Sequence, residues 1–166
     1  NEAELEDFEA ELKHYPKWVI NGIDTLHGGA FDFIILDTPP GPTVYLQQAL
    51  MAAHRALVVV LADAASYASI PKITALVEHY TADRTDFHGM NLLLNQMPTH
   101  GKLAHQVRTA LFADHGAQMV PVAIHKDVQV AQALAFERPV LQYEPGCKAS
   151  LDIQYLADWL LDSAEN

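Results

Sequence analysis

The stretch Phe31-Asp32-Phe33-Ile34-Ile35-Leu36-Asp37-Thr38-Pro39-Pro40-Gly41 joins an apolar run, a carboxylate and a stiff turn. An uninterrupted apolar run such as residues 33–36 predicts a strand that helices cover on both faces. Asp37 then stands at the C-terminal end of that strand, where open α/β sheets bind their ligands. The two prolines remove backbone donors and stiffen the turn, whereas Gly41 leaves it free to move. The stretch therefore predicts a ligand-sensing loop, or else a strand that ends in an Asx-type turn before a helix starting near Val44.

Further apolar runs of strand length follow along the chain, at residues 57–61, 90–94, 119–124 and 140–141. Apolar residues recur at helical spacing in the remaining segments, at residues 5–12, 18–26, 70–80, 103–111 and 153–160. Gly116 marks the place where one of these helices is expected to stop. Strands that alternate with helices in this way predict right-handed βαβ units and a three-layer α/β/α fold with a mostly parallel sheet. We expect residues 1–166 to form a single domain of this class.

The composition is that of an ordinary globular chain of 166 residues, with 50% hydrophobic residues, 19% charged residues and a mean hydropathy of +0.02. One cysteine, Cys147, excludes a disulfide-rich scaffold and favours a reducing, cytoplasmic compartment. No run approaches the ~20 apolar residues that a membrane-spanning helix needs. The first four residues, Asn-Glu-Ala-Glu, are not those of a signal peptide, and we expect the chain to be a fragment of a longer protein.

The net charge of −11 is concentrated at the two ends of the chain. Residues 1–13 hold six acids and one lysine, and residues 149–166 hold four acids and no base. An acidic chain without a basic stripe is not expected to bind nucleic acid directly, because that affinity depends on neutralising phosphates. It is also expected to be a poor partner for anionic lipid and not to insert directly into a membrane. The last helix, with Trp159 beside its apolar stripe, is expected to pack on the sheet. The acidic first helix is expected to be a solvated face, or to dock on a basic partner.

Several reactive side chains have ordinary structural interpretations. The nine histidines are scattered without metal-ligand spacing, so we interpret them as surface and loop residues. Cys147 has no histidine or acid at motif spacing and is interpreted as an inert thiol. Asp127 is interpreted as the N-cap of a helix that runs through Phe136.

The stretch Asp37-Thr38-Pro39-Pro40-Gly41 resembles the Walker B and switch II signature of the deviant-Walker-A P-loop ATPases, the MinD/ParA family. The likeness continues in the family's order over about residues 30–160 and is greatest to the family's representative in bacterial cellulose synthase operons. Residues 56–61 resemble the strand after switch II, and Asn91-Leu92-Leu93-Leu94-Asn95 resembles a strand that ends in an adenine-contacting Asn. The segment beside the base in the family is matched by Ala123-Ile124-His125-Lys126-Asp127, Val130, Ala133 and Arg138-Pro139-Val140.

This resemblance implies an ATP-dependent homodimer that uses Mg²⁺ and serves the assembly or positioning of a cellulose secretion machine. It implies partners among the other cellulose synthase operon proteins, which would bring the protein to the inner membrane or cell pole. Asp37 would hold Mg²⁺ through water and take part in catalysis. Pro39, Pro40 and Gly41 would switch with the nucleotide state. Adenine would be bordered by Asn95, Ile124 and His125.

The chain also departs from the family pattern. His125 stands where the family usually has Pro, and Glu137 where it usually has Gly. Residues 1–166 contain no Gly-x-x-x-x-Gly-Lys-Ser/Thr loop, and the only adjacent glycines are Gly28-Gly29. Such a loop cradles the phosphates, so this chain alone is not expected to hydrolyse ATP. By resemblance, the P-loop strand lies between the strands at residues 33–36 and 57–61, whose edges would otherwise be unpaired. We therefore expect a longer N-terminus or pairing with another copy.

Three alternatives to the cellulose ATPase remain open. The first is a non-catalytic scaffold or interaction domain of the same fold. The missing P-loop favours it if the chain is complete, whereas the intact motif from Asp37 to Gly41 favours the ATPase if the chain is a fragment. The second is a chromosome- or septum-positioning ParA/MinD homologue. The third is another P-loop relative, such as a biotin-pathway ligase, although the chain shows no recognisable binders for a substrate carboxylate.

Overall fold

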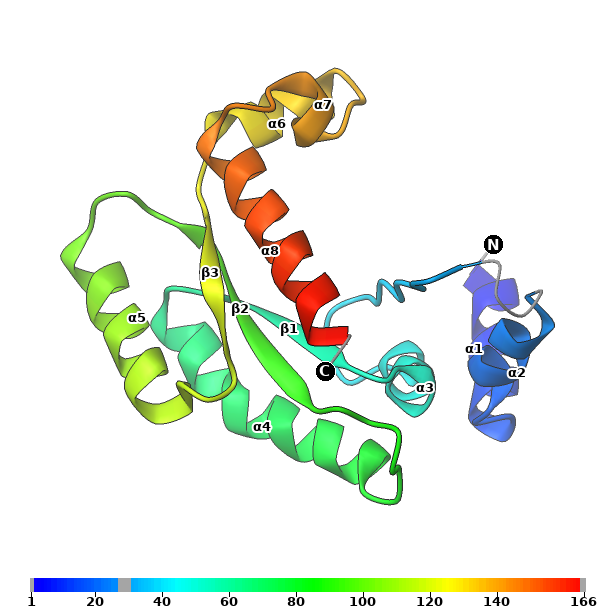
Figure 1. Ribbon diagram of the computed structural model, residues 1–166. Helices are drawn as coiled ribbons and strands as arrows, with labels where there is room; N and C mark the ends of the chain where they lie inside the picture. Colours follow the sequence, from blue (N-terminus) through cyan, green and yellow to red (C-terminus); the bar gives the residue numbers. More distant parts are fainter. Residues whose placement is uncertain (1, 27–30, 165–166) are drawn as a thin grey trace. The chain divides into compact units, whose positions relative to one another are not determined.

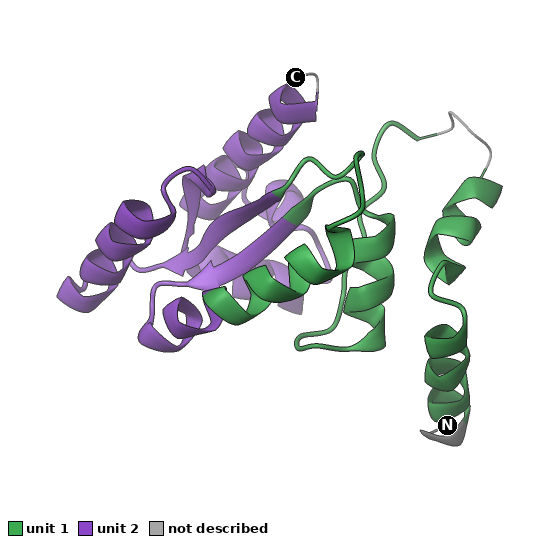
Figure 2. Cartoon of the chain, turned by 90° about the horizontal axis from the view of Figure 1, so that it is seen from below, with its two compact units in different colours: residues 1–56, 71–89 green, residues 57–70, 90–166 purple. Residues whose placement is uncertain are grey.

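A computed structural model describes residues 2–26 and 31–164. The chain forms two compact units, residues 1–56 with 71–89 and residues 57–70 with 90–166 (Figure 2). The expectation of one domain over residues 1–166 stays a prediction. The elements, in chain order, are α1 (Glu2–His14), α2 (Trp18–Thr25), α3 (Val44–Ala52), β1 (Ala56–Leu61), α4 (Ala64–Thr81), β2 (Met90–Met97), α5 (Lys102–His115), β3 (Met119–His125), α6 (Val128–Ala135), α7 (Val140–Tyr143) and α8 (Lys148–Ala164) (Figure 1).

The second unit is built around a three-stranded sheet in the order β1-β2-β3, in which β2 and β3 run parallel. These strands form where the apolar runs at residues 57–61, 90–94 and 119–124 predict them. Leu92, Leu94 and Val120 are completely or almost completely buried, as expected for strands that are covered on both faces. β1 is an edge strand of this described sheet, and its Val59 side chain is 56% exposed.

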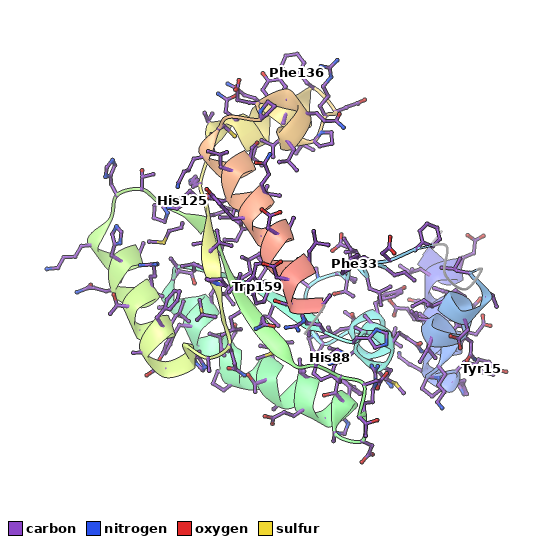
Figure 3. The ribbon with its side chains drawn as sticks, in the orientation of Figure 1. Tyr15, Phe33, His88, His125, Phe136 and Trp159 are labelled. Carbon is purple, nitrogen blue, oxygen red and sulfur yellow. The ribbon has the colours of Figure 1, made fainter. Side chains whose placement is uncertain are left out.

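Helices cover both faces of the sheet, which confirms the predicted three-layer α/β/α fold (Figure 1). On one face, α8 packs against β3 through a cluster of apolar side chains; α5 contacts β3 from the opposite face. Trp159 of α8 packs against this cluster, as the sequence predicts (Figure 3). The buried members of the cluster are Leu93, Val120, Ile124 and Ala149.

The first unit contains α1, α2 and α3, which pack together around Leu12. Gln48 of α3 is 1% exposed, and its side chain joins all three helices. Its amide Nε2 donates to the carbonyl oxygens of Leu12 and Tyr15, each at 2.8 Å, and its Oε1 accepts from the Val19 backbone N–H at 3.2 Å. Because these backbone groups lie at the end of α1 and the start of α2, one buried side chain replaces the partners that helix ends lack.

Two of the predicted strands are wrong. Residues 33–36 are extended but belong to no sheet, and Ile35 is 90% exposed. A strand needs a neighbour for its backbone groups, and no described strand is paired with this segment. Residues 140–141 begin the short helix α7, because Pro139 has a φ of −58° and its carbonyl oxygen accepts from the Gln142 and Tyr143 backbones.

The predicted helices are confirmed at α1, α2, α4, α5 and α8, and α3 begins at Val44 as expected. The helix that ends near Gly116 does so without a left-handed glycine, because Gly116 has a φ of −50°. No helix in the described part of the chain is long and apolar enough to cross a membrane.

Candidate functional site

The stretch from Asp37 to Gly41 lies in the first unit, directly before α3. Asp37 is exposed and makes no hydrogen bond or ion pair with any described residue, so its carboxylate oxygens are available to a ligand. Pro39, Pro40 and Gly41 are exposed. The structure does not test the roles predicted for these four residues.

The turn at Gly41 depends on the glycine itself. Its φ of +97° is a conformation that residues with a side chain rarely adopt, and its carbonyl oxygen accepts from the Thr43 backbone N–H at 2.9 Å. Thr43 then caps α3, since its Oγ1 accepts from the Leu46 backbone N–H at 3.3 Å. The predicted loop is therefore a defined turn that leads from Asp37 straight into a capped helix.

Asn95 lies in β2, but it does not end the strand. β2 continues to Met97, and between the pairs Leu94–Ala123 and Met97–His125 it carries one residue more than β3. Gln96 accommodates this bulge with a φ of +50°. The half-buried Asn95 side chain stabilises the bulge, because its Oδ1 accepts from the Gln96 backbone N–H at 2.9 Å.

His125 ends β3 and is held by a buried carboxylate of α8. Oδ2 of Asp152 lies 2.9 Å from the His125 backbone nitrogen and 2.8 Å from its Nδ1. The Asp152 side chain is 5% exposed and that of His125 is 27% exposed. The Lys148 ammonium lies 3.6 Å from the other Asp152 oxygen, which partly compensates the buried charge.

Asp127 fastens the same end of β3 to α8. It is the N-cap of α6, as the sequence predicts, and accepts from the Gln129 backbone N–H at 3.0 Å. Its other oxygen accepts from the Ala149 backbone N–H at 3.3 Å. The pKa of Asp127 is lowered, chiefly by the bond from Gln129, because these donors favour the charged carboxylate.

Glu137 stands at a position where the backbone conformation favours the glycine of the family pattern. It follows α6 with a φ of +53°, the left-handed conformation that favours glycine. Its backbone N–H donates to the Leu134 carbonyl at 3.0 Å, and that of Arg138 to the Ala133 carbonyl at 3.0 Å. These two bonds are those of a Schellman motif, so the position calls for glycine on conformational grounds alone.

The structure brings three of the predicted site residues together. Asn95, Ile124 and His125 belong to neighbouring parallel strands of the second unit and lie near the same sheet edge. The Ile124 side chain is 8% exposed and packs in the hydrophobic cluster. The roles predicted for these residues beside a base stay predictions.

Sequence reasoning missed Asp152. The signal was present, because Asp152 falls among the apolar residues of α8, one position before Ile153 and four before Leu156. An acid on the buried side of a helix needs a partner, and His125 supplies it.

We also considered metal-ligand clusters, surface hollows and the adjacent glycines as candidate sites. No cluster of three or more His, Cys, Asp or Glu side chains among the described residues could hold a metal ion. A hollow of about 420 Å³ is lined by Glu11, Tyr15, Trp18 and neighbouring residues of α1 and α2, none of them a predicted site residue. His27 and the pair Gly28-Gly29 lie outside the described residues.

Comparison with solved structures places the fold among the MinD-like ATPases. The ATP complex of a McdA variant from Cyanothece superposes with a TM-score of 0.72 at 16% identity, covering 93% of this chain and 63% of that one. The Mg-ADP complex of the septum site-determining protein MinD from Pyrococcus horikoshii gives a TM-score of 0.64 at 19% identity, covering 87% of this chain and 56% of that one.

Sequence comparison finds curated relatives in the same group. Cell division protein PomZ of Myxococcus xanthus is 29% identical over 132 residues, which are 79% of this chain and 41% of PomZ. The putative cellulose biosynthesis protein BcsQ of Escherichia coli is 24% identical over 144 residues, 86% of this chain and 54% of that protein. The chain thus spans about half the length of these relatives. The family described as cellulose biosynthesis protein BcsQ matches residues 1–161. Because this match covers nearly the whole sequence, the chain belongs to the BcsQ family, within the MinD/ParA-like ATPases.

Proposed function

We propose that the complete protein is a MinD/ParA-like ATPase of bacterial cellulose biosynthesis or secretion, which dimerises with ATP and releases its partners after hydrolysis. The observation that carries the proposal is the BcsQ family match over residues 1–161. The context of cellulose rests on the family's description and on that of the Escherichia coli relative. Other products of the cellulose synthase operon are the proposed partners, and the cytoplasm, next to the inner membrane or cell pole, is the proposed location.

Asp37 is proposed to hold Mg²⁺ through water. A carboxylate is the type of ligand that Mg²⁺ prefers, and the Asp37 oxygens have no partner among the described residues. Bound Mg²⁺ neutralises charge that develops on transferred phosphate oxygens. The Gly41 turn links Asp37 to α3, so a small change at the carboxylate can move the start of that helix.

The adenine base is proposed to lie at the edge of the sheet where β2 and β3 end. Asn95 and His125 both present polar groups there, on parallel strands whose carboxyl ends form the usual ligand edge of an α/β sheet. Ile124 is buried directly before His125 and anchors the end of β3 in the core.

Turnover of the Asp37→Ala variant tests the proposal. The experiment uses the product of the complete reading frame and measures Mg²⁺-dependent release of phosphate from ATP. Asp37→Ala is expected to reduce turnover at least 100-fold while circular dichroism is unchanged. Asp32→Ala is the matched control, because Asp32 is an exposed acid of the same segment and should leave turnover as it is. Equal turnover in the wild type and Asp37→Ala contradicts the proposed role of Asp37.

A non-catalytic scaffold of the same fold is the second candidate; residues 1–166 contain no P-loop. The two candidates differ in what precedes the Asn1 codon. Sequencing the source gene upstream, together with the intact mass of the protein, separates them. A continuing frame that encodes a Gly-rich loop with lysine supports the ATPase, whereas a frame that begins at Asn1 supports the scaffold.

A further inference from the structure

The acidic residues of α1 divide between two faces of the helix. Glu4, Asp7 and Glu11 are exposed and follow one another at intervals of three and four residues, which places them on one side of an α-helix. Glu9 is directed elsewhere, because the hydroxyl of Tyr45 in α3 donates a hydrogen bond to it. α1 therefore presents a row of three exposed carboxylates, which we call the carboxylate row.

A hollow opens at the end of this row, between α1 and α2. It measures about 420 Å³ and is lined by Glu11, Tyr15, Trp18, Asn21, Gly22 and Thr25. This volume lies within the range of sites that take a small ligand, roughly 300–1,000 Å³. Glu11 belongs to both features, so the carboxylate row leads into the hollow. The neighbouring lysines, Lys13 and Lys17, are not among the lining residues.

Two aromatic rings and a carboxylate give the hollow its chemistry. Tyr15 projects from the turn between the helices and is 61% exposed (Figure 3). Trp18 is 45% exposed, and its ring packs edge-to-face on Phe8 with the ring centroids 5.5 Å apart. The side chain of Glu11 has no partner among the described residues. Because the faces of tryptophan and tyrosine rings attract cations, this lining favours a positively charged group.

Gly22 keeps the hollow open. It lies inside α2, where every residue except proline stabilises a helix better than glycine does. Its φ is not positive, and a Cβ at this position would meet no atom within 4 Å, so the packing of the helix does not require a glycine. A side chain here would extend into the hollow that Gly22 lines. The glycine is thus accounted for by the open space beside it.

A guanidinium group fits this lining better than an ammonium group. It is planar, so it can lie flat on an aromatic ring, and its forked N–H groups can bind both oxygens of Glu11. An ammonium group is compact and more strongly hydrated, so it gains less from a ring face. Residues 1–13 hold six acids and one lysine, a charge that attracts a basic partner and repels nucleic acid and anionic lipid.

We propose that α1 and α2 form a docking surface for an arginine-rich segment of a partner protein. One arginine of that segment enters the hollow, where its guanidinium lies against Trp18 and pairs with Glu11. Further basic side chains of the segment lie along the carboxylate row. The surface shares no residue with the proposed Mg²⁺ and nucleotide sites, so it goes beyond the proposed function and does not depend on it.

A peptide titration followed by NMR tests the proposal in the product of the complete reading frame. The probe is a short alanine-based peptide with three arginines at intervals of three and four residues. Its counterpart carries citrulline, which keeps the shape of arginine without the charge. The indole N–H signal of Trp18, assigned by its loss in Trp18→Phe, reports on the hollow, whereas that of Trp159 reports on the second unit. We expect only the arginine peptide to shift the Trp18 signal, with an affinity that weakens as salt is added, and the Trp159 signal to stay in place.

Two variants with a matched control locate the binding. Glu11→Gln is expected to weaken the arginine peptide about tenfold, because it removes a charge-assisted pair. Asp24→Asn is the control, since Asp24 is an exposed acid of α2 outside the lining of the hollow, and it should weaken binding about twofold at most. Gly22→Met fills the hollow and should abolish binding while helix content, measured by circular dichroism, is kept or raised.

Each contrary outcome overturns the docking proposal. Equal effects of Glu11→Gln and Asp24→Asn would show a diffuse attraction to an acidic chain, and equal binding of the citrulline peptide would show that charge is not read. Unchanged affinity in Gly22→Met would show that the hollow is not used. A Trp18 signal that ignores the peptide and exchanges slowly would show that another segment of the chain, or a second copy, covers the hollow. None of these results bears on ATP binding, which is measured separately.

Discussion

Oδ2 of Asp152 accepts two hydrogen bonds from one residue, the backbone N–H and the ring Nδ1 of His125. The pair joins the last residue of β3 to the first turns of α8, and Asp127 repeats the connection two residues further along the chain. α8 also packs on the sheet through Trp159. The end of β3 is therefore held to α8 by this packing and by the side chain and backbone of His125. Such a support keeps the polar groups at this end of the sheet in a fixed orientation.

Gln48→Ala is expected to loosen α1 and α2 from α3. The substitution leaves the carbonyls of Leu12 and Tyr15 and the Val19 N–H without their buried partner, at a cost of about 2 kcal/mol. Amide hydrogen exchange in α1 and α2 should accelerate, while the strands of the second unit keep their protection. Gln47→Ala is the control, since the neighbouring amide only approaches the Met51 sulfur at 4.0 Å. Equal effects of the two substitutions would show that Gln48 does not hold the helices.

Stability between pH 5 and pH 2 should depend on Asp127. Its folded-state pKa is lowered from the ordinary value of 3.8, chiefly by the Gln129 N–H. A lowered pKa contributes stability that is present above the unfolded-state value and is lost as the pH falls through the folded-state value. Asp127→Asn keeps a capping oxygen but cannot titrate. The difference in melting temperature between wild type and variant should therefore be constant above about pH 5 and shrink below pH 4. A constant difference down to pH 2 contradicts the lowered pKa of Asp127.

Glu137→Gly should stabilise the chain. The φ of +53° at Glu137 brings Cβ close to the backbone, and glycine removes that strain for a gain of about 1 kcal/mol. Thermal unfolding should shift upward by roughly 2–4 °C for a chain of this size. Glu137→Ala removes the same carboxylate but keeps Cβ, and should give no such increase. A similar gain from both variants would assign the effect to charge and not to the left-handed backbone.

Self-association of the 166-residue chain should depend on the edge of β1. Val59 is 56% exposed on an edge strand of the described sheet, and such strands pair readily with other chains. Val59→Lys places a charge there and should shift sedimentation toward smaller species. Leu134→Lys is the control, because Leu134 is 78% exposed and belongs to helix α6, not to a strand. If both variants reduce association equally, general hydrophobic contact is responsible and edge pairing is not.

The three strands of the sheet were predictable from the sequence, because burial on both faces requires a continuous run of apolar residues. Residues 57–61, 90–94 and 119–124 read as continuous apolar runs, since helices cover the sheet they form. The cap at Asp127 was predictable for a local reason, because its partner Gln129 lies two residues away.

Residues 33–36 show where such patterns fail. Their composition is that of a buried strand, yet a strand also needs a partner, and the described chain pairs none with them (Figure 3). The contacts of Asp152 and Gln48 were out of reach for a related reason, since each joins elements that lie more than 25 residues apart. Only the three-dimensional arrangement shows which distant backbone group a buried polar side chain will meet.

The molecular mass of the complete protein in solution, measured by light scattering in Mg-ATP and in Mg-ADP, tests the proposed nucleotide switch most directly. The account predicts the mass of two copies in ATP and of one copy in ADP. The same mass in both nucleotides, with no nucleotide retained by the protein, would contradict the ATPase switch and leave a scaffold of the same fold.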